Sequence, residues 1–165
     1  MYQIDDYVVY GSAGVCRIVD IRQESFGDAG DREYYVLDSV YGNRMQTYIP
    51  VDNISVTMRP ALKKEEVLDL IQSLPDIDSE WIQDDNQRRT LFAEILQSCD
   101  PAQIAYLIKM IYHRQKELQE LGKRLTSADS EALKTAEKLL YDEFALVLDI
   151  QIEQVIPFIA EKIPV

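Results

Sequence analysis

The chain has 165 residues, of which 17 are Lys or Arg and 29 are Asp or Glu, giving a formal net charge of −12 at pH 7. This acidity excludes broad, nonspecific binding to nucleic acid or anionic lipid but leaves room for a local basic face. Hydrophobic residues make up 47%, a share typical of globular proteins, and no apolar run reaches the ~20 residues of a membrane span. With no basic signal segment at its start, we expect a soluble cytoplasmic protein.

Short runs typical of strands, separated by glycines and polar residues, dominate residues 1–58. These runs cover residues 7–10, 15–24, 33–40, 45–49 and 54–57. Gly42 suits a tight hairpin turn between two of them. Because both faces carry apolar residues, we expect five antiparallel strands that curl into a small barrel. The edge strands are either covered by loops or able to accept a partner's strand, with Tyr41 and Tyr48 supplying side-chain contacts.

From residue 59 the period of the apolar residues changes from two to about 3.6, which predicts helices. We expect a linker over residues 59–62 and then about five helices, at residues 63–74, 86–98, 101–121, 127–148 and 151–161. Asp100 and Thr126 are good N-cap residues, Gly122 ends the third helix, and we expect a bend at Pro157. The sequence therefore predicts an α+β protein of two domains, a barrel at 1–58 and an all-α bundle at 63–165.

Residues with catalytic or metal-binding chemistry are few. The chain has two cysteines, Cys16 and Cys99, and one histidine, His113. Structural zinc sites use about four Cys or His ligands, and no zinc-binding spacing occurs, so both cysteines are expected to be small reduced hydrophobes. His113 stands among basic neighbours, a poor setting for a general base. We expect no metal, no cofactor, no small-molecule substrate and no catalysis; a hydrolase or transferase dependent on His113 is the enzymatic alternative.

A basic segment stands out within the helical part. Residues 109–124 hold five basic and two acidic side chains, which reverses the sign of the chain's charge. On a helical wheel Lys109, His113 and Lys116 lie opposite the apolar face. This surface is either an ordinary solvated helix face or a phosphate-binding face.

Trp81, the only tryptophan, lies in an acidic connector over residues 76–85. It is either a core anchor or an exposed aromatic wedge able to push against a base step in a minor groove. The polar connector favours exposure, since Ile82 is its only apolar neighbour. The acidic residues disfavour DNA because they would repel phosphates. The pattern leaves both interpretations open.

Further motifs occur in order along nearly the whole chain. In the sheet part they are DDYVVY at residues 5–10, YYVL at 34–37 and YIPVDN at 48–53. In the helical part they are Trp81, the pair Arg88 and Arg89, SCD at 98–100, LTS at 125–127 and AEKLL at 136–140. Taken together, these motifs resemble the CarD/CdnL family of bacterial transcription regulators, and the sheet part also resembles the RNA-polymerase-interaction domain of transcription-repair coupling factors.

The resemblance implies a Tudor-like or SH3-like barrel that docks on a lobe of the RNA polymerase β subunit, partly through a strand edge. It also implies a helical domain that contacts promoter DNA at the upstream edge of the melted bubble. There a tryptophan wedges into the minor groove and basic residues hold the backbone. A factor that binds melted DNA better than closed DNA stabilises the open complex without catalysing a reaction.

Carried over by position, the resemblance assigns the wedge to Trp81 and phosphate contacts to Arg88 and Arg89. Charge alone adds four weaker candidates for DNA contact, which are Lys109, Lys116, Lys123 and Arg124. Where some family members carry a basic pair after the Thr126 cap, this chain has Ser130 and Glu131.

On the sheet, Arg22 falls where family members carry a polymerase-contacting arginine. Tyr48 stands where some members have arginine and coupling factors have tyrosine. With Tyr41, these are the predicted polymerase-binding residues. The alternative function is a polymerase-binding adaptor whose acidic helical domain binds another protein rather than DNA.

Overall fold

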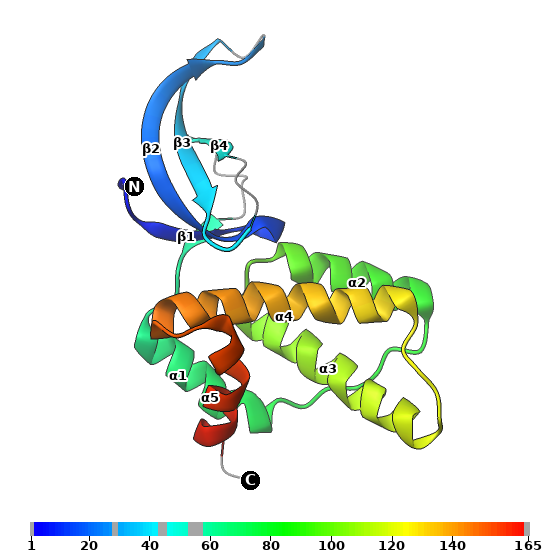
Figure 1. Ribbon diagram of the computed structural model, residues 1–165. Coiled ribbons are helices and arrows are strands. Elements are labelled where there is room, and N and C mark those ends of the chain that lie inside the picture. Colours follow the sequence, from blue (N-terminus) through cyan, green and yellow to red (C-terminus); the bar gives the residue numbers. More distant parts are fainter. Residues whose placement is uncertain (1, 28–29, 43–45, 53–57, 164–165) are drawn as a thin grey trace. The chain divides into compact units, whose positions relative to one another are not determined.

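The structure, a computed structural model, describes residues 2–27, 30–42, 46–52 and 58–163 (Figure 1). The chain divides into two compact units, with the boundary between Ala61 and Leu62. The first unit is an antiparallel sheet and the second is helical, so the predicted α+β architecture of two parts is confirmed.

The first unit is a five-stranded antiparallel sheet in the order β4-β3-β2-β1-β5. Its strands are β1 (Tyr7–Tyr10), β2 (Gly14–Ser25), β3 (Asp31–Ser39), β4 (Gln46–Pro50) and β5 (Met58–Pro60). Four strands follow one another as a meander and β5 returns to β1, an arrangement that suits a small curled barrel. Among the described residues β4 and β5 are the edges. Arg59 and Pro60, which we assigned to the linker, pair with β1, and the predicted strand at 54–57 lies outside the described residues.

A β-bulge in β2 decides which side chains face the core. The pairing of β2 with β3 shifts between Ile18 and Asp20, so one extra residue enters β2 and the strand bends (Figure 1). Ile18 and Ile21 both pack on the core, although an unbroken strand would place them on opposite faces. The bulge therefore turns Arg22 to the opposite face, where it pairs in register with Tyr34.

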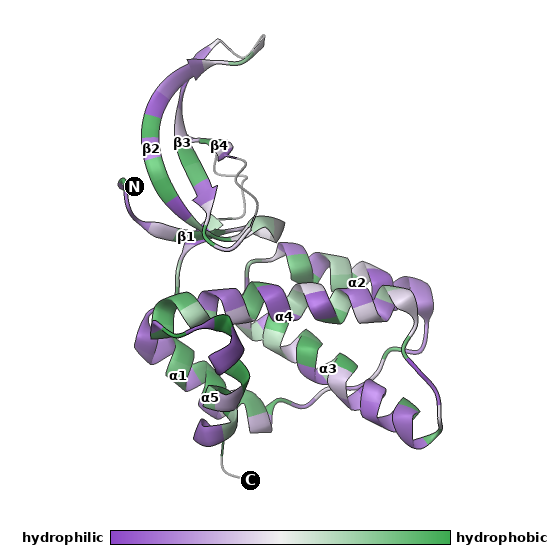
Figure 2. Ribbon diagram, viewed as in Figure 1, coloured by the Kyte–Doolittle hydropathy of each residue, from purple (hydrophilic) through white to green (hydrophobic). Residues whose placement is uncertain are grey.

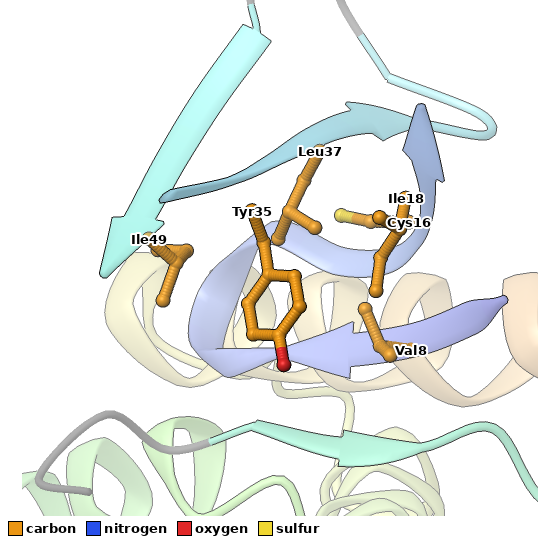
Figure 3. Packing of buried hydrophobic residues seen from close by; sticks show 6 residues of the cluster. All are labelled: Val8, Cys16, Ile18, Tyr35, Leu37 and Ile49. Carbon is orange, nitrogen blue, oxygen red and sulfur yellow. The ribbon is translucent and has the colours of Figure 1, made fainter. Parts of the chain in front are cut away.

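Six buried side chains from four strands fill the inside of the curved sheet: Val8, Cys16, Ile18, Tyr35, Leu37 and Ile49 (Figure 3). Full burial of an aliphatic side chain of this size contributes about 1.5–3 kcal/mol. The Tyr35 hydroxyl accepts a hydrogen bond from the backbone N–H of Tyr2 at 3.1 Å, which satisfies its polar end. Burial, and then Asp38, raises the pKa of the Cys16 thiol to about 11, so Cys16 is the protonated, hydrophobic side chain that we expected.

The helical unit contains α1 (Lys64–Ser73), α2 (Asp85–Gln97), α3 (Pro101–Glu120), α4 (Ser127–Leu148) and α5 (Val155–Lys162). Short 3-10 helices cover Leu74–Asp76 and Ile152–Gln154. α4 is the central helix, because it contacts each of the other four. Its buried stripe at helical spacing consists of Leu133, Ala136, Leu140, Phe144 and Leu148. The last turns of α3 are hydrophilic (Figure 2).

The helix ends confirm most of the predicted signals. The Asp100 carboxylate accepts the backbone N–H of Ala102 at 3.0 Å, and the Thr126 hydroxyl accepts that of Asp129 at 3.2 Å. Gly122 has φ +70°, which only glycine adopts freely, and it follows the last turn of α3 in a Schellman-type ending. Pro157 lies in the first turn of α5, where its missing N–H breaks no helical hydrogen bond, and the expected bend is instead a 3-10 turn that precedes α5.

Candidate functional site

Four side chains on the outer face of the sheet form what we call the sheet patch: Arg22, Phe26, Tyr34 and Tyr48. The Phe26 ring meets the rings of Tyr34 and Tyr48 edge to face, with centroids 5.1 and 5.3 Å apart. Tyr34 is buried, whereas Phe26 is 45% exposed. The patch therefore presents an aromatic surface that stands on a buried ring.

Arg22 adds a positive charge to this aromatic surface. Its Nη2 donates to the Tyr48 hydroxyl at 3.1 Å, and its guanidinium carbon lies 5.4 Å from the Tyr48 ring centroid. Its Nε lies 3.5 Å from Asp20 and 3.8 Å from Glu24, with no hydrogen-bond partner among the described residues. The side chain is 40% exposed, so a carboxylate of a partner can reach the guanidinium.

The structure brings together two of the three residues predicted to bind polymerase. Arg22 and Tyr48 are in contact, and Tyr48 lies on β4, an edge strand among the described residues. Tyr41 is half-buried beyond the end of β3 and is not a member of the sheet patch. Sequence reasoning missed Phe26 and Tyr34, because their contacts with Arg22 and Tyr48 depend on strand pairing and on the bulge in β2 that turns Arg22 toward Tyr34.

Trp81 lies in the irregular segment between the 3-10 helix at 74–76 and α2, and it is half-buried. Its ring meets Phe92 edge to face at 6.3 Å between centroids. Two cations lie over the ring: the guanidinium carbons of Arg88 and Arg114 are 4.6 and 5.6 Å from its centroid. We call Trp81, Arg88, Phe92 and Arg114 the tryptophan site. The indole is thus neither fully buried nor fully exposed, and it is supported by α2 and α3.

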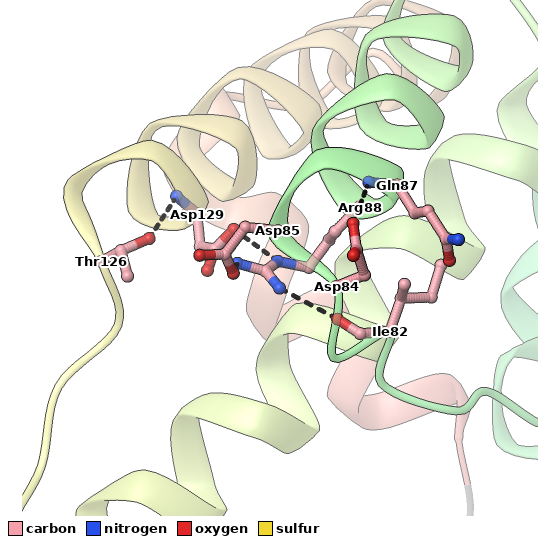
Figure 4. A network of polar contacts seen from close by, with 7 residues as sticks. All are labelled: Ile82, Asp84, Asp85, Gln87, Arg88, Thr126 and Asp129. Carbon is pink, nitrogen blue, oxygen red and sulfur yellow. Dashed lines mark hydrogen bonds and ion pairs between the residues drawn. The ribbon is translucent and has the colours of Figure 1, made fainter.

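Arg88 is a buried structural residue, and this corrects its prediction as a phosphate contact. It is only 4% exposed. Its Nε donates to Asp129 at 3.0 Å, its Nη1 to the carbonyl of Ile82 at 2.9 Å, and its Nη2 to Asp85 at 2.7 Å (Figure 4). Burial lowers the pKa of Arg88, but the hydrogen bonds to Asp129 and Asp85 outweigh burial and raise it overall. Arg88 therefore joins the starts of α2 and α4 beneath Trp81.

Two acidic residues near Trp81 have internal roles. Asp84 is the N-cap of α2 and accepts the backbone N–H of Gln87 at 2.8 Å (Figure 4). Asp85 pairs with Arg88, so its charge is balanced within the fold. Asp78 and Glu80 remain exposed in the connector. Of the acidic residues in this segment, only Asp85 is thus paired with a cation among the described residues, and the segment keeps an acidic surface.

The predicted basic residues other than Arg88 divide into one half-buried and four exposed side chains. Lys109 donates from Nζ to the carbonyl oxygens of Leu74 and Pro75 at 2.7 and 3.0 Å. It caps the end of α1 and is half-buried, so its contact with DNA stays a prediction. The exposed side chains are Arg89, Lys116, Lys123 and Arg124.

Sequence reasoning missed Arg114 and Asp129 as members of this region. Arg114 pairs with Glu117 at 3.2 Å and reaches the Trp81 ring from α3. Asp129 is 2% exposed and binds Arg88, which is 41 positions away in the sequence. The sequence did place Asp129 in the first turn of a predicted helix. An acidic residue is favourable there even when it faces solvent, so this position did not indicate a buried ion pair.

In the part of the chain that the structure describes, no three His, Cys, Asp or Glu side chains are placed to hold a metal ion. Over the same residues, none of the helices combines the length and the apolar character that a membrane span needs.

The fold and these two sites define a two-unit interaction protein, with one aromatic and basic site on each unit. The family model for the CarD-like/TRCF RID domain matches residues 2–62, and that for the CarD C-terminal domain matches residues 66–160. The chain therefore belongs to the CarD family. No curated protein sequence matches it.

Family membership identifies the chain as a transcription regulator that interacts with RNA polymerase. Regulators of this family are generally not enzymes. The family model over residues 2–62 covers both CarD-like proteins and transcription-repair coupling factors. This match confirms the predicted resemblance of the sheet unit to coupling factors.

Proposed function

We propose that this regulator docks on the RNA polymerase β subunit through the sheet patch and the edge strand β4. The helical unit then contacts promoter DNA at the upstream edge of the melted bubble and stabilises the open complex. The observation that carries the proposal is the half-exposed Trp81, which is held over a buried arginine in an otherwise irregular segment.

The sheet patch has the composition of a binding hot spot. Such sites are rich in Tyr, Trp and Arg and lie on well-packed surroundings. Phe26 is exposed on a buried Tyr34, and Arg22 is positioned by Tyr48. Because β4 is an edge strand among the described residues, its backbone can pair with a strand of the polymerase while Tyr48 contributes a side-chain contact.

The tryptophan site has the rigidity that a wedge needs. Unstacking a base step costs a few kcal/mol, so an inserted side chain must be firmly supported. Phe92 and the guanidinium of Arg88 support the Trp81 ring, and Arg88 is fixed by Asp85 and Asp129. The exposed cations Arg89, Lys116, Lys123 and Arg124 are the candidates for contacts to the DNA backbone.

An acidic regulator can act on DNA because polymerase brings it there. A net charge of −12 makes its own affinity for duplex DNA low. Docking turns the DNA contact into an intramolecular step, for which a short connection provides an effective concentration of roughly millimolar. The open complex gains stability only by the difference in affinity for melted and closed DNA.

Pull-down with the isolated β-subunit lobe, followed by footprinting on a promoter, tests the proposal. We expect the full chain to bind the lobe and to extend protection at the upstream edge of the bubble only when polymerase is present. Lack of binding to the lobe would contradict the docking surface. Binding without added protection would instead favour the adaptor, whose acidic helical unit, with Asp78 and Glu80 exposed, binds another protein.

Neutralising the exposed cations should reduce the dependence of open-complex retention on salt. We expect the triple change Lys116→Gln, Lys123→Gln and Arg124→Gln to reduce the slope against log salt concentration by up to about 3, roughly one per phosphate contact. Retention is measured at salt concentrations between 50 and 200 mM, a range of about fourfold.

The matched control removes three exposed lysines elsewhere on the helical unit: Lys63, Lys64 and Lys134. Both triple variants change the net charge equally, so a general electrostatic effect would move both slopes. Equal slopes for the two variants would contradict a local DNA contact at the end of α3.

A further inference from the structure

A pocket of about 390 Å³ lies in the helical unit, apart from the tryptophan site. α3, α4, α5 and the 3-10 helix after α1 contribute its walls, and most lining residues are apolar, among them Leu74, Ile108, Leu140 and Ile159. Pockets that hold small organic ligands have volumes of about 300–1,000 Å³ and mainly apolar walls with few polar groups. This pocket has the size and the lining of such a site.

The polar groups of the pocket favour a negative charge. Its basic lining residues are Lys109 and His113, and none of the described lining residues is acidic. The Lys109 ammonium has three N–H donors and gives two of them to the carbonyls of Leu74 and Pro75. One N–H is left for a ligand, and the two carbonyls fix the position of the charge. The lining therefore carries basic and no acidic side chains among the described residues, although the chain as a whole has a net charge of −12.

A half-buried phenol adds a second donor. Tyr141 lines the pocket from α4, and burial, followed by the charges of Glu137 and Tyr112, raises its pKa to about 12. The hydroxyl therefore stays protonated over the physiological range and can donate a hydrogen bond to an acceptor. Glu137 is a carboxylate that acts on Tyr141, and desolvation raises its own pKa.

We propose that this pocket binds a small amphipathic organic anion, with an alkyl or aryl body against Ile108, Leu140 and Ile159 and an acidic head group at Lys109. The apolar walls take up the body, and a charge-assisted hydrogen bond from Lys109 fixes the head. This assignment stands apart from the proposed contacts with polymerase and DNA, since it uses none of the exposed cations proposed there; Lys109 is half-buried and held by backbone carbonyls.

Titration of the full chain with octanoate, octanol and octylammonium tests the proposal. These probes share one alkyl chain and differ in the charge of the head. We expect octanoate to bind about tenfold more tightly than octanol, the equivalent of about 1.4 kcal/mol, and octylammonium to bind most weakly. In NMR spectra the largest amide shifts should occur at Ile108, Leu140 and Ile159. Equal affinity for all three probes, or shifts elsewhere, would overturn the assignment.

Two pairs of variants locate the site. Ile108→Trp fills the pocket and should abolish octanoate binding, whereas Gln103→Trp adds the same side chain to an exposed position of α3 and should not. Lys109→Met should remove the preference for octanoate over octanol, and Lys109→Arg should keep it. If Lys109→Met loses octanol binding as well, its cap has failed and the Ile108 pair decides. Octanoate binding that survives Ile108→Trp would refute the site.

Discussion

Replacing Arg88 with alanine is expected to destabilise the helical unit by about 3–5 kcal/mol, because it leaves a buried carboxylate without its partner. Asp129 is 2% exposed, and Arg88 is the cation that pairs with it at 3.0 Å. A loss of this size lowers the melting temperature of a domain of about 100 residues by roughly 15–25 °C. Urea and thermal unfolding, followed by the far-UV circular dichroism of the helices, measure it.

A double variant separates this structural role from a contact with DNA. In Arg88→Met with Asp129→Leu both charges are replaced by apolar side chains, so most of the lost stability should return. If Arg88 only supports Trp81, the double variant should also regain much of the effect on the open complex. A single Arg88→Ala variant with unchanged stability but a shortened open-complex lifetime would contradict the structural assignment and restore the phosphate contact.

Replacing Arg22 with glutamate is expected to weaken binding to the β-subunit lobe by about 100-fold or more, since truncation of a hot-spot arginine alone costs 2 kcal/mol or more. The new carboxylate would stand beside Asp20 and Glu24, where Arg22 is now the balancing charge. Tyr48→Ala should weaken binding in the same direction, because it removes both the edge-strand contact and the group that positions Arg22. Binding is measured by pull-down and calorimetry.

Arg17→Glu is the matched control for this charge reversal. Arg17 lies on the same strand, is exposed, and pairs only with the exposed Asp5 among the described residues. It should leave binding to the lobe within about twofold, because surface ion pairs contribute little. Equal losses for Arg17→Glu and Arg22→Glu would show a general charge effect, and unchanged binding by Arg22→Glu and Tyr48→Ala would refute the docking surface.

Local rules predicted most of the fold. The caps at Asp100 and Thr126 and the glycine at Gly122 act through neighbouring backbone groups, so their signals lie within a few residues. The bulge in β2 was not predictable in this way. Strict alternation would place Ile18 and Ile21 on opposite faces of the sheet, whereas both pack on the core. Only the pairing of β2 with β3 reveals the extra residue that makes this possible.

The candidate sites depended more on contacts between distant residues. Exposed cations such as Lys116, which were predicted from charge alone, remain candidates for contact with DNA. Arg88 was misassigned, since a basic side chain that is neutralised by a distant carboxylate such as Asp129 looks the same in sequence as one that faces solvent. The hydrogen bonds of Lys109 to backbone carbonyls were hidden in the same way. The same limit hid the support that Arg114 gives to Trp81.

The lifetime of open complexes at saturating regulator, compared between the natural chain and Trp81→Ala, tests the central claim most directly. Stacking against a base is worth about 1–3 kcal/mol, so we expect the variant to shorten the lifetime at least about fivefold, while its binding to the β-subunit lobe and its helix content stay unchanged. Trp81→Phe, which keeps an aromatic ring, should give an intermediate lifetime. Equal lifetimes for all three chains at equal polymerase occupancy would contradict the account.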